Sequence, residues 1–330
     1  MDVSCGFSIL GSGSYLPENA ISAALIAEKM NVSVKWVLGK TGVETRYFAE
    51  NETIASMAAK AVNKALENAG MIASDIDLLI AAGGTPDQPI PHNSALIHKE
   101  LDFPNTVTPL DVDATCMSFI QATKIAASLL ENKIYKNIVV VSAEKPSVGL
   151  DYNWPESAAL LGDGAVAFIF GSSEKSSGML FSEFTTINEG VHLAEIPAGG
   201  TRIPPKGIDS THSDQFLFKM EGQKIYKLAS KYLPDFFENV FNKQKCSFDD
   251  FKMVVPHQAS LMGLGLMRRK LGIPKEKYYI NVQNYGNLVA ASVPMALHEL
   301  LHDKKVQKGD DIMLACTAAG LTLGVLGLRL

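Results

Sequence analysis

Cys116 has the residue type and the sequence position of a nucleophile. It follows the β-rich stretch Val107–Val112 and precedes apolar residues at helical spacing, so it lies at or beside the N-terminus of a predicted helix. Unpaired N–H groups and the positive end of the helix dipole at that point favour a thiolate, which is a strong nucleophile at neutral pH. Taken alone, Cys116 could equally be a small buried hydrophobic residue.

Two more polar residues with chemical potential lie far downstream. His257 follows the apolar stretch Phe251–Val255, and Asn287 also falls just after a predicted strand. In α/β folds, ligands gather beyond the carboxyl ends of strands, so both side chains could face a common site with Cys116. Considered separately, His257 could be a loop histidine, and Asn287 beside Gly286 could be an ordinary turn residue.

The elements that would position these residues occur twice. A helical stripe over 53–69, ended by Gly70, precedes a strand over 77–82; a second stripe over 225–240 precedes a strand over 251–255, about 171 to 173 positions later. This order favours two copies of one α/β unit, with much parallel pairing and helices on the sheet faces. Chance agreement of two helical periods is the alternative interpretation.

Composition narrows the class of protein. With 330 residues, of which 47% are hydrophobic and 20% charged, the chain is long enough for two units or one large duplicated one. A net charge of −5 argues against a nucleic-acid binder. Its 4 cysteines lie far apart with no CxxC pair, which argues against a disulfide framework and a metal site. Without a secretory signal or a membrane-spanning stretch, we expect a cytoplasmic protein without membrane association.

Several short motifs, in order along nearly the whole chain, identify a family. The sequence resembles the β-ketoacyl-acyl-carrier-protein synthase III family of thiolase-like condensing enzymes. The motifs that carry the resemblance are Trp36–Val43, Asp113–Cys116, Leu161–Ala165, Pro256–Ser260, Asn284–Asn287, Ala290–Pro294 and Ala318–Gly324. The resemblance implies an α/β fold of the thiolase-like, five-layered αβαβα kind, internally duplicated, and a homodimer. It places the nucleophilic cysteine in an N-terminal half (1–172) and the histidine and asparagine in a C-terminal half (173–330).

The resemblance also implies a mechanism without a cofactor or metal. Cys116 would take an acyl group from an acyl-coenzyme A, and His257 and Asn287 would polarise the thioester carbonyl of malonyl-acyl carrier protein or malonyl-coenzyme A. Loss of carbon dioxide would then give a carbanion that attacks the acyl-cysteine. Backbone N–H groups of Cys116 and Gly320 would form the oxyanion hole. An amide suits this chemistry because an aspartate in its place would repel the enolate.

Five residues match binding positions of the family. Trp36 and Lys40 would contact coenzyme A, Ile90 would cross the dimer to floor the partner's acyl pocket, and Arg269 and Lys270 would dock the acyl carrier protein. Each has a structural alternative. The tryptophan ring could belong to the core, and basic residues in a last turn also offset the helix dipole.

Departures from the family pattern leave the substrate open. Lys40 stands where an arginine is usual, Leu288 and Val289 follow Asn287, and a loop usually made of three glycines reads 318–320 Ala-Ala-Gly. These changes favour a specialised relative over an enzyme primed with acetyl-coenzyme A. Non-decarboxylative transfer to an alcohol, an amine or a second acyl thioester is one alternative function, and a catalytically silent subunit is another. The sequence does not give the length or branching of the acyl chain.

Overall fold

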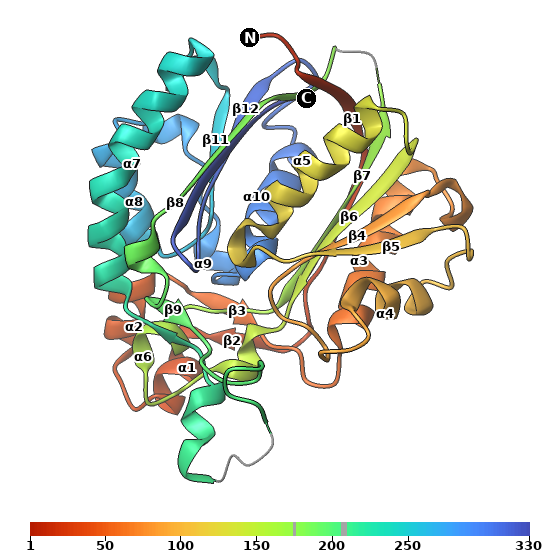
Figure 1. The fold of residues 1–330 in the computed structure, drawn as a ribbon. Coiled ribbons are helices and arrows are strands. Elements are labelled where there is room, and N and C mark those ends of the chain that lie inside the picture. The colour runs from red at the N-terminus through yellow and green to blue at the C-terminus, as the bar shows by residue number, and fades with distance from the viewer. Residues whose placement is uncertain (174–175, 206–209) are drawn as a thin grey trace.

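The computed structural model describes residues 1–173, 176–205 and 210–330, and its strands form one large sheet in the order β11-β12-β13-β8-β1-β7-β6-β4-β5 (Figure 1). The strands of this sheet are β1 (Cys5–Tyr15), β4 (Leu78–Ala82), β5 (Thr108–Val112), β6 (Asn137–Glu144), β7 (Gly164–Ser172), β8 (Gly178–Thr186), β11 (Met253–Pro256), β12 (Asp311–Ala318) and β13 (Thr322–Arg329).

The sheet consists of two halves that repeat one pairing scheme. In one half, β4 and β6 are parallel, and β7 and β1 follow with antiparallel pairing. In the other, β11 and β12 are parallel, and β13 and β8 follow in the same way. Among the described residues, the two halves of the sheet are joined by strand pairing between β1 and β8, where Cys5 pairs with Met179 and Gly6 with Gly178. The predicted internal duplication is therefore confirmed, whereas the predicted division between residues 172 and 173, just after β7, stays a prediction.

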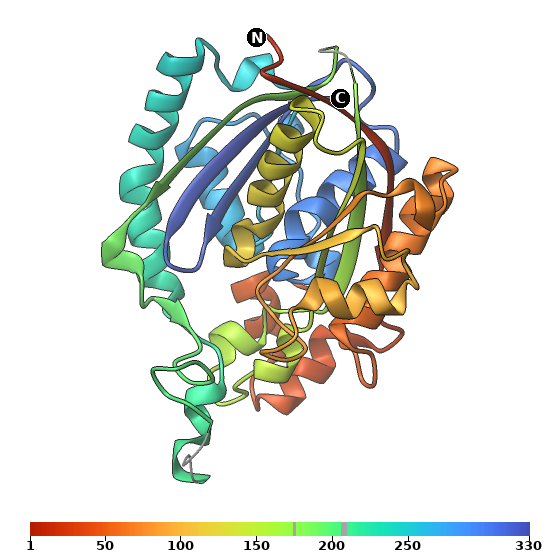
Figure 2. The same ribbon diagram turned by 45° about the vertical axis from the view of Figure 1, so that its right-hand side comes forward.

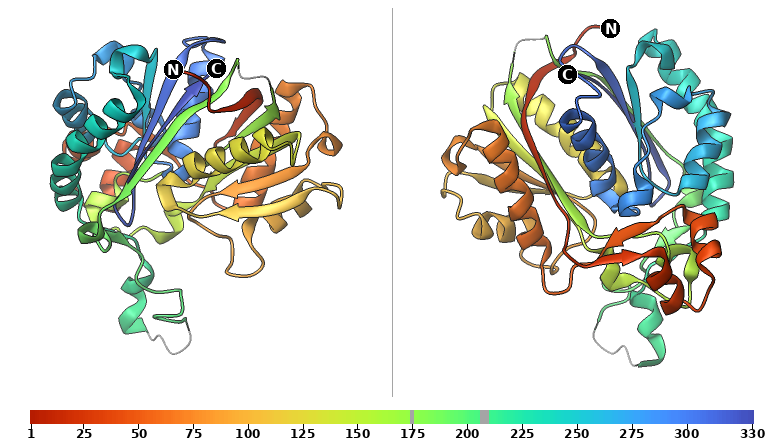
Figure 3. Two further views of the ribbon diagram at one scale, coloured as in Figure 1. Left: turned by 45° about the horizontal axis from the view of Figure 1, so that its top comes forward. Right: turned by 180° about the vertical axis from the view of Figure 1, so that it is seen from behind.

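Helices cover both outer faces and fill the space between the halves. Figure 1 shows α5 and α10 in the middle, α7 and α8 on one outer face, and α3 and α4 on the other; the view from behind in Figure 3 shows the same five layers. These helices are α3 (Ile54–Ala69), α4 (Asn93–Glu100), α5 (Ser118–Glu131), α7 (Gly222–Gln244), α8 (Leu261–Lys270) and α10 (Ser292–His302).

Alternation along the strands explains the layers. Leu78 and Ile80 of β4 pack into the middle core with α5 and α10, whereas Leu79 and Ala81 pack against α3. Since successive side chains of a strand point to opposite faces, an uninterrupted apolar run is buried on both sides. In the other half, Met313 of β12 packs with α7 in a third core.

The predicted helix over 53–69 forms as α3. Thr53 and Ser56 make a reciprocal capping box at its start, and Gly70 ends it with a φ of 65°, in the left-handed region that glycine enters at little cost. The predicted apolar stripe faces the sheet: Ile54, Met57, Ala58, Ala61, Val62, Ala65 and Leu66 are all buried.

Shorter elements gather at the end of the molecule where β4, β6 and β11 finish, and residues 190–205 and 210–220 extend outward there (Figure 2). They are α1 (Ala23–Lys29), α2 (Val34–Thr41), α6 (Pro155–Ala158), α9 (Val282–Tyr285), β2 (Ala20–Ser22), β3 (Thr45–Tyr47), β9 (Ala194–Glu195) and β10 (Lys219–Met220). Within the described ranges, no helix has the length and apolarity to span a bilayer.

Candidate active site

Cys116 lies in a tight turn between β5 and α5. It is the middle residue of a 3-10 turn, Thr115–Met117, which ends directly before the first residue of α5. The sequence predicts this position beside the helix start. Thr115 has a φ of 51°, a strained value for a β-branched residue. Ser118 stabilises the turn because its hydroxyl accepts from the Ala114 N–H (2.9 Å) and donates to the Thr115 carbonyl (2.6 Å). The nucleophile candidate is thus held rigidly at the helix start.

The charge state of Cys116 differs from the expectation. Burial, and then the nearby Glu144 carboxylate, raise the pKa of the Cys116 thiol to about 12, while the backbone N–H groups of Ala319 and Cys116 act in the opposite direction. The predicted thiolate is therefore wrong for the free protein, whose Cys116 is a thiol at neutral pH. A helix N-terminus does not compensate for the loss of water around the sulfur.

This pKa predicts how Cys116 reacts with an alkylating agent. Below its pKa, the thiolate fraction rises about tenfold for each pH unit, and only the thiolate reacts. We expect the rate of Cys116 modification by iodoacetamide, followed by peptide mass spectrometry, to rise steeply without a plateau between about pH 8 and pH 10. A plateau below pH 9 would indicate a thiol activated in the free enzyme and would contradict the assigned shift.

His257 follows β11 and is held by its backbone. Its N–H donates to the Ala315 carbonyl on β12 (2.7 Å), and its side chain is only 6% exposed. Burial lowers the pKa of His257 to about 4, so the imidazole is neutral at neutral pH. Its Nδ1 is buried without a hydrogen-bond partner among the described residues. A neutral ring of this kind can donate to a developing oxyanion but is a weak base.

Gln258, next to this histidine, fixes the loop. Its side-chain amide donates to the carbonyls of Pro256 (2.8 Å) and Tyr279 (3.2 Å), and its Oε1 accepts from the Asn281 N–H (2.9 Å). Gln258 is 1% exposed and joins the end of β11 to the segment that leads to Asn287. This connection between two chain segments could not be seen from the sequence alone.

Asn287 is positioned by a turn that requires glycine before it. Gly286 has a φ of 71°, and a Cβ on it would lie 2.6 Å from the Leu160 carbonyl oxygen. The Asn287 N–H donates to that same oxygen (2.9 Å). Its Oδ1 accepts from the Val289 N–H (2.8 Å) and the Ser292 hydroxyl (3.3 Å). The amide NH2 is therefore the end that remains for a ligand.

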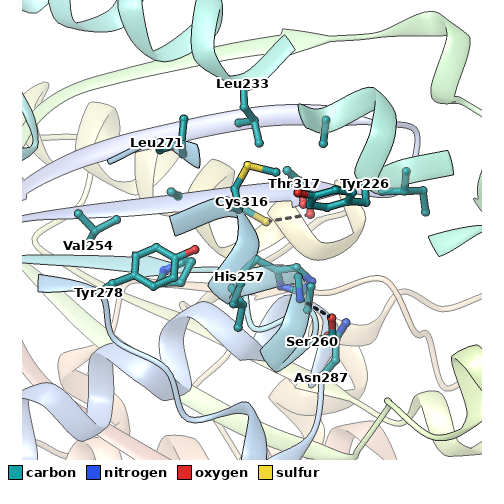
Figure 4. Close-up of a pocket in the computed structure, with 18 of the residues that line it drawn as sticks. Tyr226, Leu233, Val254, His257, Ser260, Leu271, Tyr278, Asn287, Cys316 and Thr317 are labelled. Atoms are coloured by element: carbon teal, nitrogen blue, oxygen red, sulfur yellow. Dashed lines mark hydrogen bonds between the residues drawn. The ribbon is translucent and has the colours of Figure 1, made fainter. Parts of the chain in front are cut away.

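Two adjoining cavities bring the three residues together. Cys116 and Asn287 line a cavity of about 510 Å³, and His257 and Asn287 line a second of about 210 Å³ (Figure 4). The cavities share six residues: Leu160, Met220, Ile225, Ala259, Asn287 and Thr317. The predicted backbone donor Gly320 lines the larger cavity, as Cys116 does. The geometry therefore places a thiol, a neutral imidazole and an amide around one junction.

The predicted binding residues lie elsewhere. Trp36 is partly buried on α2 and Lys40 is exposed on the same helix, and neither lines the two cavities. Ile90 is 85% exposed. Arg269 and Lys270 are exposed at the end of α8.

Glu144 is a residue of this site that sequence reasoning missed. Fully buried at the end of β6, it accepts from the N–H groups of Gly84 (2.8 Å) and Thr85 (3.0 Å), from the Thr85 hydroxyl, and from the Ala290 N–H (3.4 Å). It thereby joins the loop after β4 to the segment after Asn287. Burial raises the pKa of Glu144 to about 7, although these hydrogen bonds act to lower it. An acidic residue at the end of the apolar stretch 138–143 was the available signal in the sequence.

Replacing Glu144 with glutamine tests its influence on the thiol. Glu144→Gln removes the charge that raises the pKa of Cys116, so we expect Cys116 alkylation to accelerate several-fold at about pH 8, where one pKa unit corresponds to tenfold. Asp163→Asn is the matched control, since Asp163 is also buried but accepts from Ala49 and Ser147 instead. Equal acceleration in both variants would point to loosened packing and would refute the electrostatic explanation.

Comparisons with known proteins agree with this architecture. Models of 3-oxoacyl-[acyl-carrier-protein] synthase III match residues 110–188, and models of its C-terminal part match residues 241–330. The β-ketoacyl-[acyl-carrier-protein] synthase III of Aquifex aeolicus is 33% identical over 98% of this chain and 99% of its own. That of Clostridium perfringens (strain SM101 / Type A) is 32% identical over 98% of each chain.

Solved structures show the same fold. The Aquifex aeolicus enzyme superposes with a TM-score of 0.88 at 32% identity, covering 98% of this chain and 100% of its own. The priming β-ketosynthase of the R1128 polyketide pathway has a TM-score of 0.89 at 24% identity, covering 100% of this chain and 98% of its own, which supports the fold alone. The chain thus belongs to the β-ketoacyl-acyl-carrier-protein synthase III family, and it is an acyltransferase of the condensing type.

Proposed function

We propose that this protein catalyses decarboxylative Claisen condensation of an acyl-coenzyme A with malonyl-acyl carrier protein or malonyl-coenzyme A, in fatty-acid synthesis or in specialised lipid or polyketide synthesis. The observation that carries the proposal is the meeting of Cys116, His257 and Asn287 at the junction of two cavities. One cavity gives the acyl chain a place beside the thiol, and the other gives the malonyl thioester a place beside the imidazole and amide.

Each step has a residue suited to it. Cys116 attacks the acyl thioester carbonyl, a carbon–sulfur bond forms, and coenzyme A leaves as its thiol with the proton of Cys116. The malonyl group then loses carbon dioxide, and the electron pair of the broken bond becomes an enolate whose oxygen accepts from His257 and Asn287. The enolate carbon bonds to the acyl carbonyl carbon. Finally the Cys116 thiolate leaves and takes a proton from solvent.

The neutral state of the His257 ring favours decarboxylation over abstraction of a proton from the malonyl carbon. A histidine whose pKa is about 4 removes a proton from a carbon poorly, whereas it can donate to an enolate oxygen. Decarboxylation needs no base. Acyl-charged enzyme mixed with the malonyl thioester should release carbon dioxide and form a 3-ketoacyl thioester. Discharge of the acyl group without carbon dioxide would favour transfer to another acceptor, and no acyl-enzyme at all would favour a silent subunit.

We infer that the exposed basic end of α8 docks the acyl carrier protein, with Arg269 and Lys270 as its charges. Reversing both charges with Arg269→Glu and Lys270→Glu should raise KM for malonyl-acyl carrier protein roughly tenfold at low salt and leave KM for malonyl-coenzyme A unchanged. The matched control is Lys308→Glu, which reverses the charge of an exposed lysine in the loop before β12. Equal loss with both malonyl thioesters would place these residues in folding or catalysis instead.

We propose that coenzyme A lies along α2, where Trp36 and Lys40 contact it. The C-terminal end of α2 adjoins α8, because a Cβ on Gly42 would overlap the Leu261 side chain, and α8 begins beside the smaller cavity. Trp36→Ala should raise KM for the acyl-coenzyme A without changing the rate at which acyl-Cys116 condenses. A change in the condensation rate alone would contradict this placement.

A second copy of the chain is the proposed partner at the sheet edge. β5 is the last strand on its side, and an unpaired edge offers hydrogen bonds to another strand. Nearby apolar side chains are exposed: Ile90 by 85% and Leu110 by 37%. We propose a homodimer in which Ile90 enters the partner's acyl cavity, working in the cytoplasm with no cofactor other than its thioester substrates. A monomeric mass by light scattering would contradict the dimer.

A further inference from the structure

Glu144 lies between two loops that adjoin the reacting groups. It is the last residue of β6, and its side chain is completely buried. Among the described residues, its carboxylate accepts from four donors. The N–H groups of Gly84 and Ala290 donate to Oε1 (2.8 and 3.4 Å), and the N–H group (3.0 Å) and the hydroxyl of Thr85 donate to Oε2. Burying a carboxylate is costly unless donors replace the water around it, and here they come from two separate loops.

The first of these loops, which follows β4, supports the turn that carries the nucleophile. Gly84 packs closely against that turn, because a Cβ on it would lie 3.3 Å from the Thr115 Cα, directly before Cys116. The Thr85 hydroxyl also accepts from the Lys145 N–H (3.0 Å), which ties the same loop to the end of β6. The buried carboxylate therefore holds a loop that is in contact with the nucleophile turn.

The second loop orients Asn287. Ala290 is the middle residue of the 3-10 turn Val289–Ala291, and the first N–H group of this turn donates to the Asn287 Oδ1 (2.8 Å). The same turn adjoins the nucleophile turn, Thr115–Met117. The carboxylate of Glu144 is thus bonded both to the support of the thiol and to the turn that fixes the amide.

The four donors require a carboxylate of this length. A glutamine has one acceptor oxygen on its amide, so its NH2 would face either the Thr85 N–H or the N–H groups of Gly84 and Ala290. An aspartate keeps both oxygens, but it is one carbon shorter and would leave at least one of the two loops. Both replacements therefore release one loop from the other.

We propose that Glu144 is a positioning residue for the condensation step, which holds the amide of Asn287 at the correct place relative to the acyl group on Cys116. This inference rests on the proposed function. Acylation needs the thiol and its backbone donors, whereas condensation also needs the amide at the enolate oxygen. A misplacement of about 1 Å can slow such a step roughly 10²-fold. Loss of the Glu144 contacts should therefore slow condensation and spare acylation.

Two substitutions separate the contacts of the carboxylate from its charge. Glu144→Gln removes the charge, and Glu144→Asp retains it. We expect both variants to slow single-turnover condensation of pre-formed acyl-enzyme with a malonyl thioester about 10- to 100-fold. Acylation of Cys116 by an acyl-coenzyme A, followed by intact mass, should slow in neither variant. Asp163→Asn alters a buried carboxylate that is bonded elsewhere, and it should leave the ratio of the two rates unchanged.

A double-mutant cycle shows whether Glu144 acts through Asn287. Asn287→Ala alone should slow condensation roughly 10²-fold and leave a measurable single-turnover rate. Adding Glu144→Asp or Glu144→Gln to it should then have much less effect than in wild type, because the amide whose place Glu144 sets is gone.

The outcomes separate this inference from the proposed function. The positioning role is refuted, and the proposed function stands, if neither Glu144 variant slows condensation or if acylation and condensation fall in parallel. Equal slowing with and without the Asn287 amide would refute it as well. If acyl-charged wild type releases no carbon dioxide from the malonyl thioester, the proposed function and this inference both fail. Either Glu144 variant suffices if the other does not fold.

Discussion

Cys116→Ala should reduce the condensation rate to background, a loss on the order of 10⁴-fold or more. Cys116, His257 and Asn287 act as a unit in the proposed reaction, so removing the nucleophile removes most of the rate enhancement. The measurement is the rate of 3-ketoacyl thioester formation from an acyl-coenzyme A and a malonyl thioester. Alanine fits the space, since the Cys116 backbone is fixed by its neighbours: the hydroxyl of Ser118 accepts from the Ala114 N–H and donates to the Thr115 carbonyl.

Cys246→Ala is the control for loss of a thiol. Cys246 is partly buried in the core beside α7, away from both cavities, so this variant should keep its activity. Cys316 would not serve, because its sulfur donates to the Cys116 carbonyl (3.3 Å) and its removal would disturb the turn. Substantial activity in Cys116→Ala would mean that the reaction proceeds without an acyl-enzyme.

His257→Ala should separate the two half-reactions. The imidazole donates to the enolate in our account, so its loss should slow condensation of pre-formed acyl-enzyme roughly 10²- to 10³-fold, as for other oxyanion donors. Acylation of Cys116 should slow much less, because the structure assigns no hydrogen bond between the two side chains. Single-turnover measurement of carbon dioxide release, with acyl transfer followed separately by intact mass, distinguishes the steps.

The pH dependence adds a second test of this histidine. Because the pKa of His257 is lowered to about 4 by burial, the neutral ring persists as the pH falls from neutrality to about pH 5, and the single-turnover condensation rate should stay level over that range. Parallel losses of acylation and condensation in His257→Ala, or a fall in condensation centred near pH 6.5, would instead assign His257 as the base that activates Cys116.

Local patterns were enough to predict the framework of the site. The stripe of α3 and its end at Gly70, and the repetition of helix and strand, follow from residue spacing because each reflects a face buried against a sheet. Strand ends were less certain: the predicted strand over 251–255 forms as Met253–Pro256, and β6 extends to Glu144. Cys116, His257 and Asn287 could be named because each matches a family motif. Cys116 and His257 also follow strands, β5 and β11, as predicted, whereas the predicted strand before Asn287 is wrong, because the short helix α9 (Val282–Tyr285) precedes it.

The chemistry around those residues depends on long-range contacts that a sequence does not contain. The thiolate prediction for Cys116 failed because the depth of burial, and the approach of Glu144 from a strand further along the chain, act against the helix dipole. The apolar lining of the smaller cavity is likewise made by side chains of α7, α8 and β11, which are distant in sequence. Periodicity marks such residues as core and cannot show the space left between them.

The most direct test of the central claim is the intact mass of the protein after incubation with a panel of acyl-coenzyme A thioesters of different length, followed by a malonyl thioester. We expect one acyl adduct on wild type and none on Cys116→Ala, and then loss of the adduct with release of one carbon dioxide for each 3-ketoacyl product. An adduct on both proteins, or none on wild type with any thioester of the panel, would contradict an acyl-Cys116 mechanism.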